Sequence, residues 1–154
     1  MQKITTFLTF DGRAEEAMKF YVSAFKNAKV VSEMRNGSAF FGGIFEIEGQ
    51  KFHVLNGGPS FSFAQGISLF VSAETQEEID ELYGKLSEGG EKQPCGWLKD
   101  QFGVSWQVVP PILGKLLGDP DREKANRAMQ AMLKMQKINI AELQEAYDGE
   151  EVAA

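Results

Sequence analysis

The most constraining feature of this sequence is an order of predicted elements that occurs twice. In each half a strand is followed by a helix and then by further strands, judged from β-branched and aromatic runs and from the helical spacing of apolar side chains. In the first half the predicted strands are residues 4–10, 29–34, 39–48 and 51–55, and the predicted helix is residues 13–25. In the second half the predicted strands are residues 66–72, 91–99 and 104–109, and the predicted helix runs from Thr75 to about Gly89. This repetition predicts an internal duplication.

The two predicted helices also resemble each other locally. Residues 13–21 read RAEEAMKFY and residues 75–83 read TQEEIDELY, so a Glu-Glu pair and a Tyr occupy the same offsets. Thr75 suits a helix N-cap, and Glu78 stands where a capping box places its acidic partner. Acidic residues are common at helix starts because of the helix dipole. The duplication is therefore inferred from the whole order of elements.

Residues 94–110, PCGWLKDQFGVSWQVVP, are typical of a hairpin whose second strand is buried. The segment has a turn-rich start and a glycine pivot at Gly103, and residues 104–109 are mostly β-branched or aromatic. We expect this second strand to close the second half. We also expect a ligand-binding cleft to lie between the two halves.

The C-terminal part is predicted to be helical. Pro110 and Pro111 end the duplicated region, and residues 112–117 predict a short helical turn. Residues 119–121, Asp-Pro-Asp, predict a helix start, and that helix is expected to end near Gln136. Residues 140–147 predict a further short helix.

Composition limits the class of protein. With 154 residues, 43% of them hydrophobic, the chain is expected to form a single domain over residues 1–154. A net charge of -6 without a basic run disfavours binding to nucleic acid or to an anionic membrane. No apolar stretch has the length of a membrane span, and the N-terminus lacks the pattern of a signal peptide. Together with a single cysteine, Cys95, this predicts a cytoplasmic protein.

The chain resembles a known superfamily over nearly its whole length. The residues that carry the resemblance are LTFDGRAEEAMKFY at 8–21, LNGGPSF at 55–61, DQFGVSWQVVP at 100–110, and the tail LLGDPDREKANRAMQAMLKMQKINIAELQEAY at 116–147. They are similar to the PhnB-like branch, labelled 3-demethylubiquinone-9 3-methyltransferase, of the vicinal-oxygen-chelate superfamily. That superfamily includes glyoxalase I, bleomycin-resistance proteins and extradiol dioxygenases.

The resemblance implies an α+β fold. Two βαβββ modules, at residues 1–58 and 62–110, would form a cupped mixed sheet, and a helical tail would occupy residues 111–148. Metal-dependent members of the superfamily place ligands on four inward strands. The corresponding positions here are Thr5 or Thr6, Phe52 or His53, Gly66, and Gln107.

Those positions offer mainly neutral or weak donors. A transition metal needs several imidazole, carboxylate or thiolate ligands, whereas Thr and Gln supply neutral oxygens and Gly supplies no side chain. The glutamate of metal-dependent relatives is replaced by Gln107. We therefore expect no bound metal and no cofactor.

Six residues are candidates for ligand binding: Thr5, Phe7, His53, Trp97, Trp106 and Gln107. His53, the only histidine, fits either a ligand anchor or general base, or a hydrogen-bonded strand residue. Trp106 and Gln107 are neighbours on one strand and must face opposite ways. Cys95 could act as a nucleophile only if His53 served as its base, and an inert small side chain is the alternative.

Several functions remain open at this point. The first is a metal-free protein that binds a small, aromatic molecule in an apolar cleft. The alternatives are the methyltransferase that the family label describes and a metal-dependent enzyme of the glyoxalase or dioxygenase type, so catalysis itself is left undecided. A homodimer is expected in each case, because Met129, Met132 and Met135 could pack on a second subunit as well as on their own chain.

Overall fold

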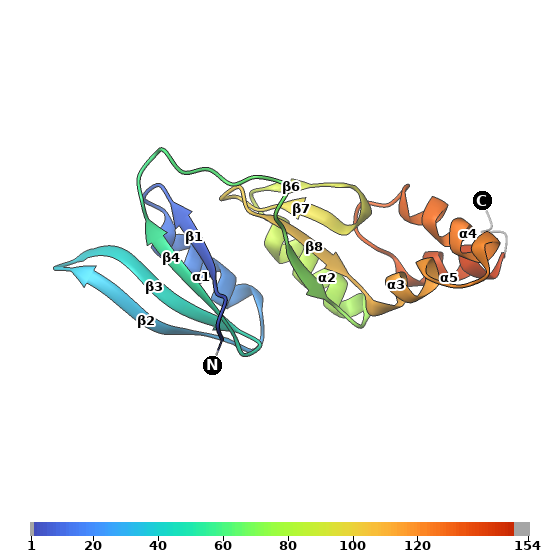
Figure 1. Cartoon of the computed structure of the whole chain (residues 1–154), viewed down its shortest axis with the longest axis horizontal. Helices are drawn as coiled ribbons and strands as arrows, with labels where there is room; N and C mark the ends of the chain where they lie inside the picture. Colours follow the sequence, from blue (N-terminus) through green and yellow to red (C-terminus); the bar gives the residue numbers. More distant parts are fainter. Residues whose placement is uncertain (1, 150–154) are drawn as a thin grey trace. The chain divides into compact units, whose positions relative to one another are not determined.

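A computed structural model describes residues 2–149 of the chain (Figure 1). It contains two compact units, Met1–Phe63 and Ala64–Ala154.

The first unit is a four-stranded sheet with one helix. Its elements are β1 (Thr6–Phe10), α1 (Ala14–Ala24), β2 (Ala28–Asn36), β3 (Ala39–Ile47) and β4 (Gln50–Asn56). The strand order is β1-β4-β3-β2, in which β1 runs parallel to β4 and the other neighbours are antiparallel. Each element lies within a few residues of its predicted position.

The helix α1 forms because small and aromatic side chains recur on one of its faces. Ala17, Met18 and Tyr21 are fully buried there, and the Tyr21 ring lies 5.8 Å from the Phe45 ring of β3. The helix begins without a cap from its own preceding residue, Arg13. Instead Oδ1 of Asn56, at the end of β4, accepts a hydrogen bond of 2.9 Å from the Ala14 N–H.

The second unit repeats the same order of elements. These are β5 (Leu69–Ser72), α2 (Gln76–Ser87), β6 (Glu91–Lys92), the 3₁₀ turn η1 (Pro94–Gly96), β7 (Trp97–Lys99) and β8 (Ser105–Val109). The strand order is β5-β8-β7-β6, with β5 parallel to β8. Thr75 caps α2 as predicted, since its Oγ1 accepts a 3.1 Å hydrogen bond from the Glu78 N–H. The two mixed sheets confirm the α+β class.

The predicted strand at residues 91–99 is interrupted. Residues 94–96 form η1, in which Cys95 has a left-handed backbone with a φ of 64°. The N–H groups of Cys95 and Gly96 do not pair with a strand. They donate to the carbonyls of Met135 and Gln136 at 2.8 and 2.7 Å, so the C-terminal segment replaces the ladder that a continuous strand would have made.

Three helices complete the second unit: α3 (Pro111–Leu117), α4 (Arg122–Met132) and α5 (Ile140–Asp148). Their shared core contains Val109, Leu113, Leu116, Ala128, Met135, Ile138 and Leu143. The helix α4 starts at the predicted Asp-Pro-Asp segment, where Asp121 is the cap and Pro120 precedes the helix, but it ends at Met132, before the predicted Gln136. The chain turns there to bring the carbonyls of Met135 and Gln136 to η1.

Within residues 2–149, none of the helices combines the length and the apolar character that crossing a bilayer requires.

Candidate functional site

One row of side chains crosses the second sheet on the face opposite α2. Phe70 of β5 pairs in register with Gln107 of β8, which pairs with Trp97 of β7. Directly paired residues project to the same side of a sheet, so the Gln107 amide lies between two aromatic side chains. Phe70 is 59% exposed.

This row borders a pocket of about 390 Å³. The lining residues come from β5, η1, β7, β8, α3, α4 and the Pro110 turn: Phe70, Cys95, Trp97, Gln107, Val109, Pro110, Pro111, Leu113, Gly114, Leu117 and Met132. None of these residues is charged. Gln107 is the one that offers both a hydrogen-bond donor and an acceptor on its side chain.

The Gln107 amide is held in place by its neighbour Ser68. Its Nε2 donates a hydrogen bond of 3.0 Å to the Ser68 Oγ. This bond uses one of the two N–H groups of the amide, and the carbonyl oxygen is the acceptor atom of this pocket-lining side chain. A buried or half-buried amide acceptor favours a ligand that brings a hydroxyl or N–H group.

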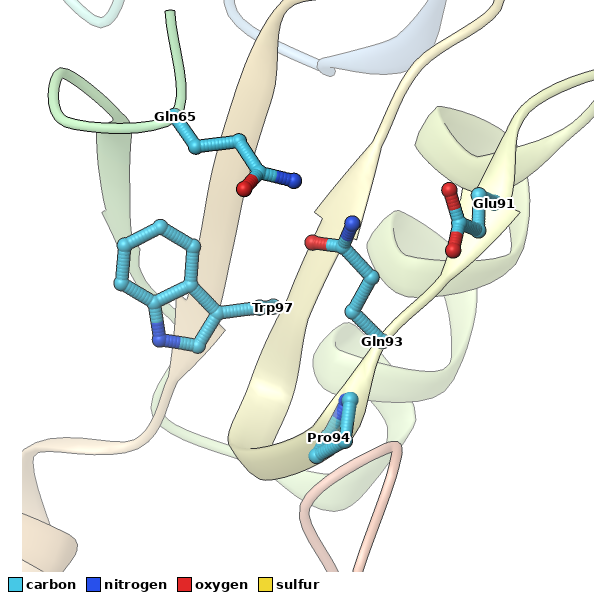
Figure 2. Close-up of a pocket in the computed structure, with 5 residues that line it drawn as sticks. All are labelled: Gln65, Glu91, Gln93, Pro94 and Trp97. Carbon is cyan, nitrogen blue, oxygen red and sulfur yellow. The ribbon is translucent and has the colours of Figure 1, made fainter.

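Trp97 also lines a second, more polar hollow of about 480 Å³, with Gln65, Glu91, Gln93 and Pro94 (Figure 2). Figure 2 shows the amide ends of Gln65 and Gln93 turned toward each other, with the Trp97 indole on the side of Gln65. Trp97 therefore borders both the apolar pocket and a set of hydrogen-bonding groups.

The backbone at Trp97 is held by hydrogen bonds from Tyr83 of α2. The Tyr83 hydroxyl lies 3.0 Å from the carbonyl oxygens of both Gln93 and Trp97, to which it donates. Tyr83 is almost completely buried. Burial raises the pKa of its hydroxyl above the ordinary value, which keeps the donor protonated.

Trp106, another candidate from the sequence, points to the face covered by α2. It is 2% exposed, and its indole N–H donates to Oδ2 of the buried Asp100 at 2.9 Å. A side chain in this position is part of the core of the unit. It has no surface left for a ligand.

The candidates Phe7 and His53 lie together on the first unit. They pair in register between β1 and β4, and their rings stack with centroids 5.6 Å apart on the face opposite α1. Thr5 stands just before β1 and is partly exposed. The structure thus brings together Phe7 with His53, and separately Trp97 with Gln107.

Cys95 has no histidine within its own unit, because His53, the single histidine of the chain, belongs to the first unit. Its Sγ lies 3.7 Å from the Met132 carbonyl oxygen. Its place in the pocket wall is explained by the left-handed turn of η1 and the hydrogen bonds described above.

The donors present do not fit a transition metal. Among residues 2–149, no three His, Cys, Asp or Glu side chains are grouped so that they could hold an ion. In the second unit the position expected to carry a glutamate is Gln107, whose amide already donates to Ser68. A neutral amide oxygen is a poor ligand for such an ion.

Sequence patterns did not identify several pocket residues. Phe70 and Ser68 are adjacent to Gln107 only because β5 runs parallel to β8 with this particular register. Leu113, Leu117 and Met132 look like ordinary helix packing residues in the sequence. Gly114 was the one sequence signal for this wall of the pocket, because an isolated glycine inside a helical pattern often has a packing or functional reason.

Comparison with known proteins points to one family. The family model described as 3-demethylubiquinone-9 3-methyltransferase matches residues 2–109. The PhnB protein from Bacillus cereus has 38% sequence identity and a TM-score of 0.63, and the match covers 71% of this chain and 99% of that one. No curated protein matches the chain.

More distant structures show the fold alone. A Pseudomonas aeruginosa protein has 19% identity and a TM-score of 0.58, and covers 71% of this chain and 98% of its own. A variant of the fosfomycin resistance protein FosX from Listeria monocytogenes, complexed with Mn(II) and 1S,2S-dihydroxypropylphosphonic acid, has 17% identity and a TM-score of 0.52. Its match covers 75% of this chain and 99% of that one. The fold is therefore the one expected from the resemblance, that of the glyoxalase, bleomycin-resistance and dioxygenase superfamily.

Proposed function

The chain belongs to the 3-demethylubiquinone-9 3-methyltransferase family, and from that premise we propose that it binds a small neutral molecule with a planar, aromatic ring in the pocket of its second unit. The observation that carries this proposal is the row formed by Phe70, Gln107 and Trp97 in the lining of the pocket.

The chemistry of the lining supports this ligand class. Phe70 and Trp97 present aromatic rings, and an aromatic ligand can pack against such rings in a stacked or edge-to-face arrangement. The absence of charged side chains among the lining residues disfavours a charged ligand, since burial would cost it hydration without a counter-ion. The volume of about 390 Å³ lies in the range of about 300–1,000 Å³ that is typical of small-molecule pockets.

Binding without a metal is part of the proposal. In this arrangement the Gln107 carbonyl oxygen, aligned by Ser68, accepts a hydrogen bond from a ring hydroxyl or N–H of the ligand. Orientation then comes from one hydrogen bond and two aromatic contacts. None of these three contacts requires a metal ion.

Ligand-observed NMR tests this function. Saturation-transfer experiments with phenol, 4-methylphenol and hydroquinone should show transfer to ring protons in the wild-type protein. Trp97→Ala and Gln107→Leu should each weaken that transfer at least fivefold. Phe7→Ala, on the first unit, is the control for a general effect of removing an exposed aromatic side chain. Equal transfer in all four proteins, or none in any, would contradict the proposed site.

Methyl transfer is the second candidate, because it is what the family description names. S-adenosylmethionine enzymes commonly use a glycine-rich loop between a parallel strand and a helix N-terminus. Here the N-terminus of α1 is occupied by Asn56 and that of α2 by Thr75, and the residues present do not fit the cofactor. We expect calorimetric titration with S-adenosylmethionine to release no binding heat.

A homodimer is a further part of the proposal. The edge strand β2 exposes Val30, Val31 and Met34 by 39, 42 and 43%, and exposed apolar side chains on an edge strand favour association. Light scattering of the purified chain should give about twice the monomer mass. A cytoplasmic location also fits the single, unpaired Cys95.

A further inference from the structure

The polar hollow beside Trp97 holds hydrogen-bonding groups that the proposed function does not use. Its volume is about 480 Å³, within the range of about 300–1,000 Å³ that is typical of small-molecule sites. It is lined by Gln65, Glu91, Gln93, Pro94 and Trp97 (Figure 2), all of them in the second unit. Trp97 alone is shared with the apolar pocket.

Three of these side chains project from one face at the edge of the second sheet. Gln93 lies opposite Trp97, because its N–H donates to the Trp97 carbonyl at 3.0 Å where the antiparallel pairing of β6 with β7 continues. Glu91 comes two residues earlier on this extended segment and so projects to the same side as Gln93. Within residues 2–149, β6 is the edge strand of its sheet, so the group lies open to a ligand.

The backbone under this hollow is held before any ligand binds. The buried hydroxyl of Tyr83 donates to the carbonyls of Gln93 and Trp97, each at 3.0 Å. A binding site that is already ordered loses less conformational freedom when its ligand arrives. Gln93 and Trp97 are therefore presented from fixed positions.

The two amides of the hollow are available to a ligand. Their ends are turned toward each other (Figure 2), and among residues 2–149 no group hydrogen-bonds to the side-chain amide of Gln65 or of Gln93. Each amide offers donors and an acceptor, and the Glu91 carboxylate offers two more acceptor oxygens. The lining contains no Lys or Arg side chain.

This combination of groups matches the chemistry of a saccharide ring. Every ring hydroxyl both donates and accepts, so two neighbouring hydroxyls can bind the donor and the acceptor of one planar amide. The C–H groups on a face of the ring form a small apolar surface, and packing it on an indole removes that surface from water. A purely apolar ligand would instead leave the amides without partners, which costs free energy.

We propose that this hollow binds the pyranose ring of a neutral carbohydrate. One C–H face of the ring packs on the Trp97 indole. The hydroxyl groups hydrogen-bond to Gln65 and Gln93 and donate to the Glu91 carboxylate. This site is separate from the one proposed for an aromatic ligand and does not rest on it.

Saturation-transfer NMR with methyl β-D-glucopyranoside tests the assignment. All ring C–H groups of this probe are axial, so each face of the ring carries its own set of protons. Transfer should be stronger to the protons of one face than to those of the other. D-Glucitol carries similar hydroxyl groups without the ring and should bind at least fivefold more weakly. Equal binding of the two probes would overturn the packing on Trp97.

Matched variants locate the site. Gln93→Leu removes an amide with little change in size and should raise the dissociation constant of the glucoside at least fivefold. Gln130→Leu removes an exposed amide from α4, outside the lining, and should stay within twofold of the wild type. Trp97→Ala should weaken binding at least fivefold. If Gln93→Leu does not fold, Gln65→Leu, at an exposed turn position, tests the same amide pair.

Gln107→Leu separates this inference from the proposed function. It should weaken the binding of phenol and leave the binding of the glucoside within twofold. If the glucoside binds and responds to Gln93→Leu while phenol does not bind, the carbohydrate site stands and the proposed function fails. If phenol binds and the glucoside does not, the inference is wrong and the proposed function stands. Equal binding of the glucoside to the wild type, Gln93→Leu and Trp97→Ala would place it elsewhere and overturn the inference.

Discussion

The indole N–H of Trp106 donates a 2.9 Å hydrogen bond to Oδ2 of Asp100, and both side chains are only 2% exposed. The other carboxylate oxygen of Asp100 accepts from the N–H groups of Phe102 and Val104 at 2.9 and 3.0 Å. One buried carboxylate therefore organises the turn between β7 and β8, including the pivot at Gly103.

We expect Asp100→Asn to destabilise the protein by about 1–3 kcal/mol, because an amide group would place an N–H opposite one of the three N–H donors. Urea unfolding followed by circular dichroism measures the change. Asp80→Asn, at an exposed position of α2, is the control and should have a much smaller effect. Equal stability of both variants would show that the carboxylate does not hold the turn.

The hydroxyl of Tyr83 should contribute both to stability and to binding. Tyr83→Phe removes the donor shared by the Gln93 and Trp97 carbonyls and is expected to cost about 1–2 kcal/mol. Because Trp97 would be held less firmly, affinity for phenol should fall as well. A variant that lost stability but bound phenol as tightly as the wild type would rule out the positioning role.

The pair formed by Tyr147 and Asp119 predicts a dependence on pH. The hydroxyl of Tyr147 lies 2.5 Å from Oδ2 of Asp119. This hydrogen bond lowers the pKa of Asp119 from 3.8 and raises the pKa of Tyr147 from 10.0. The stabilisation is therefore present between those two values. It is lost as the pH falls through the lowered pKa of Asp119 or rises through the raised pKa of Tyr147.

Thermal unfolding of Tyr147→Phe across this range is the measurement. The variant keeps the ring that lies 5.5 Å from the Lys124 ammonium group and removes only the hydroxyl. Its melting temperature should be below that of the wild type near neutral pH and should converge with it at both extremes. A constant difference at every pH would contradict the assignment.

Replacing either helical glycine by alanine should stabilise the protein. Gly84→Ala and Gly114→Ala each add a methyl group that meets no atom within 4 Å, and alanine is favoured over glycine inside a helix by about 0.5–1 kcal/mol. Chemical unfolding should show similar gains for the two variants. A loss of stability only in Gly114→Ala would mean that the pocket wall is tighter than the structure shows.

Local patterns predicted the order of elements and the Thr75 cap because each depends on residues close in the sequence. The opposite orientation of Trp106 and Gln107 also followed from strand geometry alone. By contrast, the break at η1 depends on carbonyls of Met135 and Gln136, which lie about forty residues away. The partnership of Phe70 with Gln107 depends on the register of parallel strands, and no local pattern specifies that register.

The segment after α4 is fastened to the duplicated part at several points. Besides its bonds to η1, it is held by Gln76 of α2, whose amide donates to the Ile138 carbonyl at 3.0 Å and accepts from the Ile140 N–H at 2.8 Å. A protein shortened after β8 would keep the strands described above. It would lose the two backbone partners of Gln76, whose amide would keep its bond to Asp80, and the acceptors of two N–H groups of η1. A graft of the second unit onto another scaffold must therefore bring residues 111–149 with it.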